Sequence, residues 1–286
     1  MQKYIKDYEA SITHGLQHIA PFLDPTWGND ETINLIETGQ GSRSNCLMSL
    51  GRFSNCLFLR AYFRDHNLAE MKYWASVSAK LEIMREHEAP DELTLEVMFW
   101  AMISDNQELI SWLAQHRLLG ADVNKPQTVP KVNDPVYARR LALHALKGEW
   151  EALGEGSKHA LAEPELFKKM KPRWTQYQFW LALAQGDKQA MQNIVYEMCT
   201  PKQRRYSFER ESGLTNQFIV MFATLYAKLA YHHGYELEID TPWIPRDWLP
   251  VQTLPRYEDP WPFMQRFDIW QPFAEPWSAW SPRKPV

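Results

Sequence analysis

A pair of histidines is the first place in this sequence where metal chemistry could occur. His14 and His18 lie four residues apart, so on a helix their imidazoles would lie one turn apart on the same side. A zinc protease motif needs a glutamate directly after the first histidine, and Gly15 stands there instead. The neighbouring sequence offers no obvious third ligand, which a metal site would require. We therefore expect no metal ion and no other cofactor.

The motifs for nucleophilic catalysis and for phosphate binding are missing. The sequence contains no G-x-S-x-G, no P-loop and no G-x-G-x-x-G. Cys46 and Cys56 fall within an apolar helical pattern, and Cys199 lies far from both, so we expect reduced thiols rather than nucleophiles or metal ligands. The sequence thus predicts a protein that is not an enzyme. An all-α enzyme with a site of scattered acids and arginines is the alternative.

Arginines form a row in one expected helix. Arg52, Arg60 and Arg64 follow Arg43 at spacings that bring the last three near one face. Such a row could bind a carboxylate or a phosphate. Solvated arginines, or arginines paired with acids of a neighbouring helix, would give the same pattern.

Acidic residues recur just after apolar helical segments. The recurring acids are Asp65, Asp105, Glu149 and Asp187, with Glu108 and Glu151 just inside the helices that follow. If the segments are repeats, these carboxylates would align along one rim. The residues expected to bind a partner are Asp105, Glu108, Glu149, Glu151 and Asp187. The alternative is that acids stand here only because they suit helix N-termini.

The elements that must position these residues are helices. Apolar residues recur at a helical period over 45–64 and again over 69–87. Asp134 and Thr200 each precede a proline, the pattern of a capping side chain followed by proline at the first helical position. Pro90, followed by two acids, suggests another helix start. The last long helix is expected over 214–232, ending at Gly234.

Four pairs of helices share one layout, in which an apolar helix, a tight polar turn and a second amphipathic helix follow each other. The turns are expected at 64–67, 104–106, 147–149 and 185–187. They recur about every 40 residues, which is typical of stacked helical repeats. The two Gly-containing turns resemble tetratricopeptide turns, but the full pattern is absent. We expect an all-α fold of stacked helical hairpins, a degenerate tetratricopeptide-like array. An irregular helical bundle is the alternative.

The composition changes at Asp240. Ten of the 19 prolines and six of the 13 tryptophans lie in 240–286. Proline at this density prevents long helices, whereas tryptophan is uncommon in disordered segments. We expect a helical-hairpin domain over 1–239 and an extended tail over 240–286 whose rings are buried against the helical body. A tail that binds a partner is the alternative.

Charge and hydropathy limit the possible functions. The chain of 286 residues has a net charge of −4, which argues against non-specific nucleic-acid binding. It has no apolar run of about 18 residues, so no membrane-spanning helix is expected. The first residues lack the apolar core of a secretory signal. We expect a cytoplasmic protein with no direct nucleic-acid or membrane partner.

The C-terminal third is similar to a known family. The segments in question are 222–230 (FATLYAKLA), 234–245 (GYELEIDTPWIP), 248–250 (WLP) and 257–260 (YEDP). They resemble the end of the immunity protein 49 family, and 99–102 (FWAM) and 179–187 (FWLALAQGD) resemble its middle. These helical proteins are encoded beside bacterial polymorphic toxins. The resemblance covers about residues 45–265, and its motifs are hydrophobic and structural.

The resemblance implies a cytosolic antitoxin that binds a cognate toxin domain, often a nuclease, and blocks its active site. The family has no catalytic residues to transfer to this chain. A helical-repeat adaptor that holds other proteins together, without a toxin partner, is the alternative function. A toxin reading frame beside the gene would favour the first function.

Overall fold

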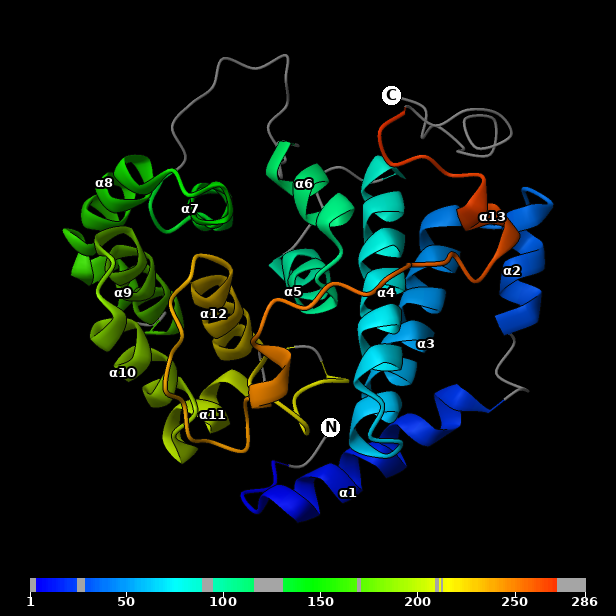
Figure 1. Ribbon diagram of the computed structural model, residues 1–286, viewed down its shortest axis with the longest axis horizontal. Coiled ribbons are helices and arrows are strands. Elements are labelled where there is room, and N and C mark those ends of the chain that lie inside the picture. The colour runs from blue at the N-terminus through cyan, green and yellow to red at the C-terminus, as the bar shows by residue number, and fades with distance from the viewer. Residues whose placement is uncertain are drawn as a thin grey trace. The chain divides into compact units, whose positions relative to one another are not determined.

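The computed structural model contains only helices as regular elements in the part of the chain that it describes. It describes residues 4–24, 29–88, 95–115, 131–168, 171–208, 211 and 213–271. No strand occurs within these ranges, which confirms the predicted all-α fold (Figure 1). The expected helix start at Pro90, residues 116–130 and the part of the tail beyond residue 271 lie outside the described residues.

Thirteen α-helices and three short 3-10 helices are found in the described ranges. The α-helices are α1 (Tyr8–Ile19), α2 (Asn29–Glu37), α3 (Arg43–Phe63), α4 (Leu68–Glu88), α5 (Leu95–Ser104), α6 (Gln107–Gln115), α7 (Pro135–Lys147), α8 (Trp150–Leu161), α9 (Lys171–Gln185), α10 (Lys188–Met198), α11 (Pro201–Phe208), α12 (Met221–His232) and α13 (Pro262–Gln265). The 3-10 helices are η1 (Ala20–Leu23), η3 (Pro164–Phe167) and η4 (Arg246–Trp248). The helices predicted over 45–64 and 69–87 are α3 and α4.

The chain divides into two units by its internal contacts. The first unit consists of Met1–Thr13 and Leu113–Gln252, and the second of His14–Trp112 and Thr253–Val286. Helices α1 and α6 each cross a border between the units, and the tail contributes to both. The division expected from composition, 1–239 and 240–286, follows a different criterion and stays a prediction.

The second unit is built around the hairpin of α3 and α4, which lie side by side along their lengths (Figure 1). Helix α3 begins at Arg43, two residues before the predicted start, and the Ser42 hydroxyl caps it by accepting a hydrogen bond from the Asn45 amide at 3.4 Å. Helix α5 packs on α4 and brings aromatic rings together, with the Phe58 and Trp100 centroids 5.1 Å apart, edge to face. A buried apolar core thus fixes this hairpin.

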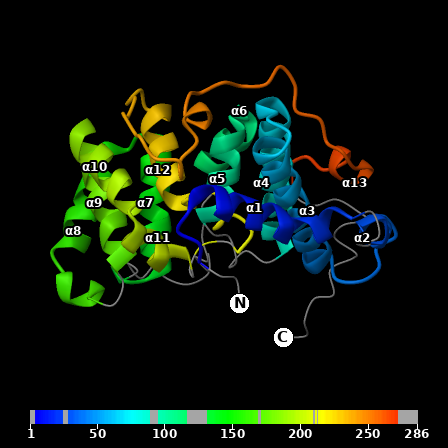
Figure 2. The same ribbon diagram turned by 90° about the horizontal axis from the view of Figure 1, so that it is seen from below.

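The first unit contains the hairpins α7–α8 and α9–α10. Helices α8, α9 and α10 follow one another as neighbours, and α12 packs on α10 (Figure 2). The core rings come from α9 and α12, where Phe179 stacks on Tyr226 with centroids 4.8 Å apart and Trp180 meets the same ring edge to face. All three side chains are buried. Stacked hairpins therefore describe this unit as predicted.

All four predicted hairpin turns are present, and each contains one residue with positive φ. This residue is Gly148 or Gly186 in the first unit and His66 or Asp105 in the second. The left-handed conformation suits glycine and is tolerated by Asp. The four turns therefore share a left-handed residue in the backbone, although only two of them have glycine at that position.

Helix α12 begins at Met221, later than the predicted residue 214, because a distant carboxylate caps it. The buried Glu211 accepts hydrogen bonds from the amides of Met221 at 2.9 Å and Phe222 at 3.4 Å. The chain just before α12 is extended, and the Val220 amide donates to the carbonyl of Trp243 at 3.1 Å. The apolar pattern continues through 214–220, but 214–218 form turns and 219–220 lie outside any helix.

The tail lies against helices of both units in separate segments. In the first unit, Trp248 is fully buried, and Lys228 Nζ donates to the carbonyls of Trp248 and Pro250, both at 2.9 Å. The Arg204 guanidinium lies 3.2 Å from the centroid of the Trp243 indole. These contacts hold 240–252 against the helices. Within this segment the only regular element is η4.

In the second unit, the tail from 253 to 271 passes α4 and α5 on its way to α13 (Figure 1). The Tyr257 hydroxyl donates to the carbonyl of Ser104 at 2.5 Å, and Lys80 pairs with Asp259 at 2.6 Å. The Trp112 indole donates to the carbonyl of Ile269 at 2.6 Å. Each of these bonds joins a tail residue to a helix far away in sequence.

Candidate functional site

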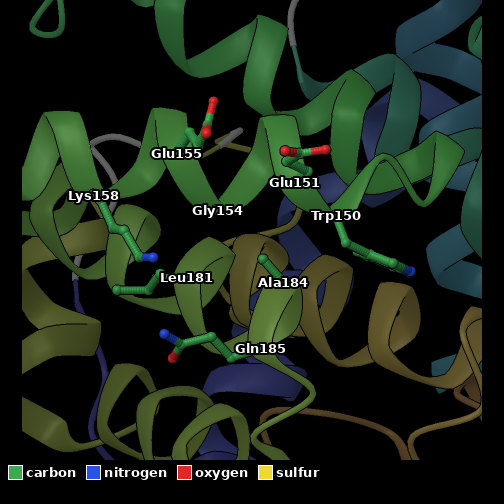
Figure 3. A pocket seen from close by; sticks show the side chains of 8 residues that line it. All are labelled: Trp150, Glu151, Gly154, Glu155, Lys158, Leu181, Ala184 and Gln185. Atoms are coloured by element: carbon green, nitrogen blue, oxygen red, sulfur yellow. The ribbon is translucent and has the colours of Figure 1, made fainter.

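A groove on the first unit lies between α8 and α9. Its volume is about 280 Å³. Its lining residues are Trp150, Glu151, Gly154, Glu155, Lys158, Leu181, Ala184 and Gln185 (Figure 3). The lining therefore combines a small apolar floor with one indole and several charged side chains.

Small residues make the floor of the groove. The backbone places a Cβ added to Gly154 at 3.5 Å from the Cβ of Ala184, so the two helices come close at this point. Trp150 stands at one end, where its indole meets the ring of His233 edge to face at 4.6 Å, and Lys158 extends near Leu181 at the other (Figure 3). The groove is thus open above Gly154 and bounded at both ends.

Two carboxylates stand on the α8 side of the groove. Glu151 and Glu155 are exposed and lie four residues apart, one helical turn along the same face (Figure 3). Within the described residues, neither carboxylate forms a hydrogen bond or an ion pair. Lys158, the third charged residue, has no ion-pair partner there either. The groove therefore presents free charge beside an apolar floor.

The other two predicted acids of the first unit already have partners. Glu149 Oε2 lies 2.5 Å from Nδ1 of His144, and Glu149 Oε1 lies 3.4 Å from Nζ of Lys147. The hydrogen bond with His144 holds the pKa of Glu149 below its ordinary value. Asp187 accepts a hydrogen bond from the Ala190 amide at 2.9 Å and caps α10. Asp187 thus caps a helix N-terminus, as the alternative interpretation of the acidic turns expects, whereas Glu149 pairs with basic side chains of α7 and makes no capping hydrogen bond.

The predicted acids of the second unit also have partners. Asp105 is buried, with 1% of its side chain exposed, and pairs with the buried Lys72 at 2.6 Å. It therefore lies in the core and not on an exposed rim, because a lysine 33 residues earlier compensates its charge. Glu108 accepts a hydrogen bond from the Trp270 indole at 3.3 Å. Among the five predicted residues, only Glu151 is exposed and without a partner in the described chain.

Two arginines of the row, Arg60 and Arg64, pair with neighbouring acids, whereas Arg52 is exposed and its guanidinium lies 3.9 Å from the sulfur of Met48. Arg60 lies 3.3 Å from Asp65 and 3.9 Å from Glu70 of the next helix, and Arg64 lies 2.7 Å from Asp65. Arg43 is buried at the start of α3, and burial lowers the pKa of its guanidinium to about 10. Paired or solvated arginines are the alternative expected for this row.

The three thiols are buried and far from ordinary reactivity. Burial raises the pKa of Cys56 and Cys199 to about 12, and that of Cys46 in the same direction. Thiolates are the reactive form, so none of these cysteines is poised as a nucleophile. The part of the chain that the structure describes contains no group of three potential ligands around a metal position.

Sequence reasoning missed Gly154, Glu155 and Lys158. Glu155 could have been found from Glu151, since an acid four residues further along an expected helix shares its face. The role of Gly154 has no sequence signal, because its neighbour Ala184 comes from a different hairpin. The groove is a product of the packing between two hairpins.

Comparison with known proteins gives no relative from which a function could be transferred. The chain matches no protein-family model, no curated protein and no solved structure. Among the described residues, no helix is long and apolar enough to cross a lipid bilayer.

Proposed function

We propose that the chain is a cytosolic immunity protein that binds a cognate bacterial toxin domain and neutralises it by covering its active site. The resemblance to the immunity protein 49 family motivates this function. The observation that carries it is the pair of exposed, unpartnered carboxylates, Glu151 and Glu155, beside the α8–α9 groove. A charged surface that the fold itself does not use suits a partner better than it suits catalysis.

A nuclease is the toxin class that fits this charge. A nuclease must approach phosphates, so the border of its active site is basic. Acids on a binding protein speed association with such a border, and buried groups near the centre of the interface slow dissociation. Neutralisation requires tight binding, because each free enzyme turns over many times. Nanomolar affinity corresponds to about −12 kcal/mol.

A helical-repeat adaptor is the second candidate function. The observation that favours it is the packing of helical hairpins in the first unit, an architecture that often supplies interaction surfaces. An adaptor would bind its partner without inhibiting it. The two functions therefore differ in whether binding abolishes an activity.

Co-expression with the product of the adjacent toxin gene tests the proposal. Cells that make the toxin domain alone should stop growing, and cells that also make this chain should grow. The purified proteins should form a complex, and the toxin should lose its activity on its substrate. A complex without loss of toxin activity would favour the adaptor, and the absence of both rescue and complex would overturn the immunity function.

A further inference from the structure

We propose that the α8–α9 groove receives an arginine side chain of the protein partner, with the guanidinium between Glu151 and Glu155 and the aliphatic stem over Gly154 and Ala184. This inference deepens the proposed function and rests on it, since it assumes a protein partner. It names the chemical group that the groove recognises and the residues that recognise it.

The first argument is the glycine in the groove floor. Glycine within a helix costs about 0.5–1 kcal/mol relative to alanine. A methyl group at Gly154 would meet Ala184 at 3.5 Å, which is ordinary van der Waals contact, so packing between α8 and α9 does not require a glycine here. The floor at Gly154 therefore has room for a methyl group, and the two carboxylates lie above it, on the side of α8 that faces away from α9 (Figure 3).

Gly156, two residues further along α8, is different. A Cβ there would lie 2.5 Å from Cδ2 of the buried Leu141. The close approach of the Leu141 side chain of α7 therefore gives Gly156 a packing reason. The two glycines of α8 therefore differ. Packing against Leu141 favours glycine at 156, whereas no packing contact requires glycine at 154.

The second argument is the arrangement of like charges. Carboxylates four residues apart on a helix repel each other and destabilise it by a few tenths of a kcal/mol. Glu151 lies in the first turn of α8, where the helix dipole compensates a negative charge, but Glu155 lies beyond that turn. A cation placed between them removes the repulsion and pairs with both.

The third argument selects arginine as the cation. Side chains four residues apart start about 5–6 Å from each other, and a planar guanidinium with five N–H donors can bond both carboxylates at this separation. Its stem can lie on the apolar floor beside Leu181, and Trp150 offers an aromatic surface at the end of the groove. Lysine offers a single point charge and gains less from this geometry.

The size and polarity of the groove agree with a side chain as the occupant. Sites for drug-sized ligands have about 300–1,000 Å³, and this groove has less. Lys158 at the Leu181 end repels a second cation, so the guanidinium is directed towards the glutamates. The groove therefore has room for one basic side chain, whose charged end lies towards the glutamates and away from Lys158.

The test measures the affinity of the full chain for the toxin domain by titration calorimetry. The double variant Glu151→Gln, Glu155→Gln should bind at least tenfold more weakly. The matched control is Glu163→Gln, Glu197→Gln, which removes the same charge at two exposed positions outside the groove and should bind within twofold of the wild type. Gly154→Leu should also weaken binding at least tenfold, while Gly154→Ala keeps the fold.

A charge swap identifies the arginine. Each arginine at the toxin's active-site border is replaced by glutamate, and one such variant should regain binding to Glu151→Lys, Glu155→Lys but not to the wild type. Unchanged affinity of the glutamine double variant, with wild-type rescue intact, would overturn the groove assignment and leave the proposed function standing.

If the wild type does not bind the toxin at all, the proposed function fails and a second probe decides the groove. N-acetyl-arginine amide is titrated into ¹⁵N-labelled protein, with N-acetyl-lysine amide as the comparison. Shifts at 150–158 and 181–185 that are larger with arginine, and absent in the glutamine double variant, support the groove. Their absence in the wild type overturns it.

Discussion

At the scale of single residues, the two glycines of α8 show how one residue type can serve opposite purposes. Gly156 lets α7 and α8 approach each other, and its carbonyl accepts a hydrogen bond from the Tyr137 hydroxyl at 2.8 Å. Gly154 faces the open groove. A stability measurement separates the two, because only one of them has a neighbour that a methyl group would displace.

Gly154→Ala should increase the free energy of unfolding by about 0.5–1 kcal/mol, since alanine favours the helix and the added methyl group fits. Gly156→Ala should lower it by about 1–2 kcal/mol, because the buried Leu141 must move. Urea denaturation followed by circular dichroism measures both. Equal effects of the two variants would contradict the different packing at these positions.

The buried pair of Lys72 and Asp105 supplies a second test at this scale. Lys72→Met should lower the free energy of unfolding by about 3–5 kcal/mol, because it leaves the Asp105 carboxylate buried without its cation. The double variant with Asp105→Asn should recover part of the loss. Asparagine tolerates the positive φ of 57° at this position. Thermal unfolding of the single and double variants is the measurement.

At the scale of elements, the sequence predicts a helix cap when the capping residue directly precedes the helix, but not when it lies further away along the chain. Asp134 was predicted to cap α7, and its carboxylate accepts a hydrogen bond from the Val136 amide at 2.8 Å. The start of α12 was placed too early, because its cap comes from Glu211, ten residues before Met221. An acid at that distance gives no recognisable capping pattern, whereas the apolar period continues unbroken.

Glu211→Gln should lower the free energy of unfolding by about 1–2 kcal/mol, because a neutral amide accepts the two amide hydrogen bonds at the start of α12 less strongly than a carboxylate. Hydrogen exchange should be faster at Met221 and Phe222 and unchanged at the start of α7. Uniform acceleration over both helices would show that the effect is not a loss of capping.

At the scale of the whole molecule, the sequence predicted the all-α class and the hairpin turns, but not the division into units. The borders run through α1 and α6, where the apolar pattern gives no sign of a boundary. The candidate site was predicted only at Glu151. Turn acids such as Asp105 were expected at the surface, and the buried Lys72 that changes this comes from another hairpin. Contacts between hairpins account for both differences.

The pH dependence of stability provides a test at this scale. Burial lowers the pKa of His233 below its ordinary value of 6.5, with a smaller contribution from His232. Between pH 6.5 and the lower pKa of the folded protein, the unfolded chain therefore binds a proton that the folded protein does not, and stability decreases as the pH falls through this range. His233→Gln keeps an N–H donor for the Ala145 carbonyl, which now lies 2.7 Å from Nε2.

The difference in urea midpoint between pH 7 and pH 5 should be smaller in His233→Gln than in the wild type. His159→Gln, at an exposed position of α8, is the control and should keep the wild-type difference. An undiminished pH dependence in His233→Gln would mean that other groups carry it.

The burial of all three thiols makes them natural reporters of how the molecule opens. Cys46 and Cys56 belong to the second unit and Cys199 to the first. An alkylating reagent reaches each sulfur only after the surrounding helices separate, so the modification rate counts opening events. Mass spectrometry should find all three unmodified over hours in buffer. In mild urea, a different rate for Cys199 than for Cys56 would reveal that the units open independently.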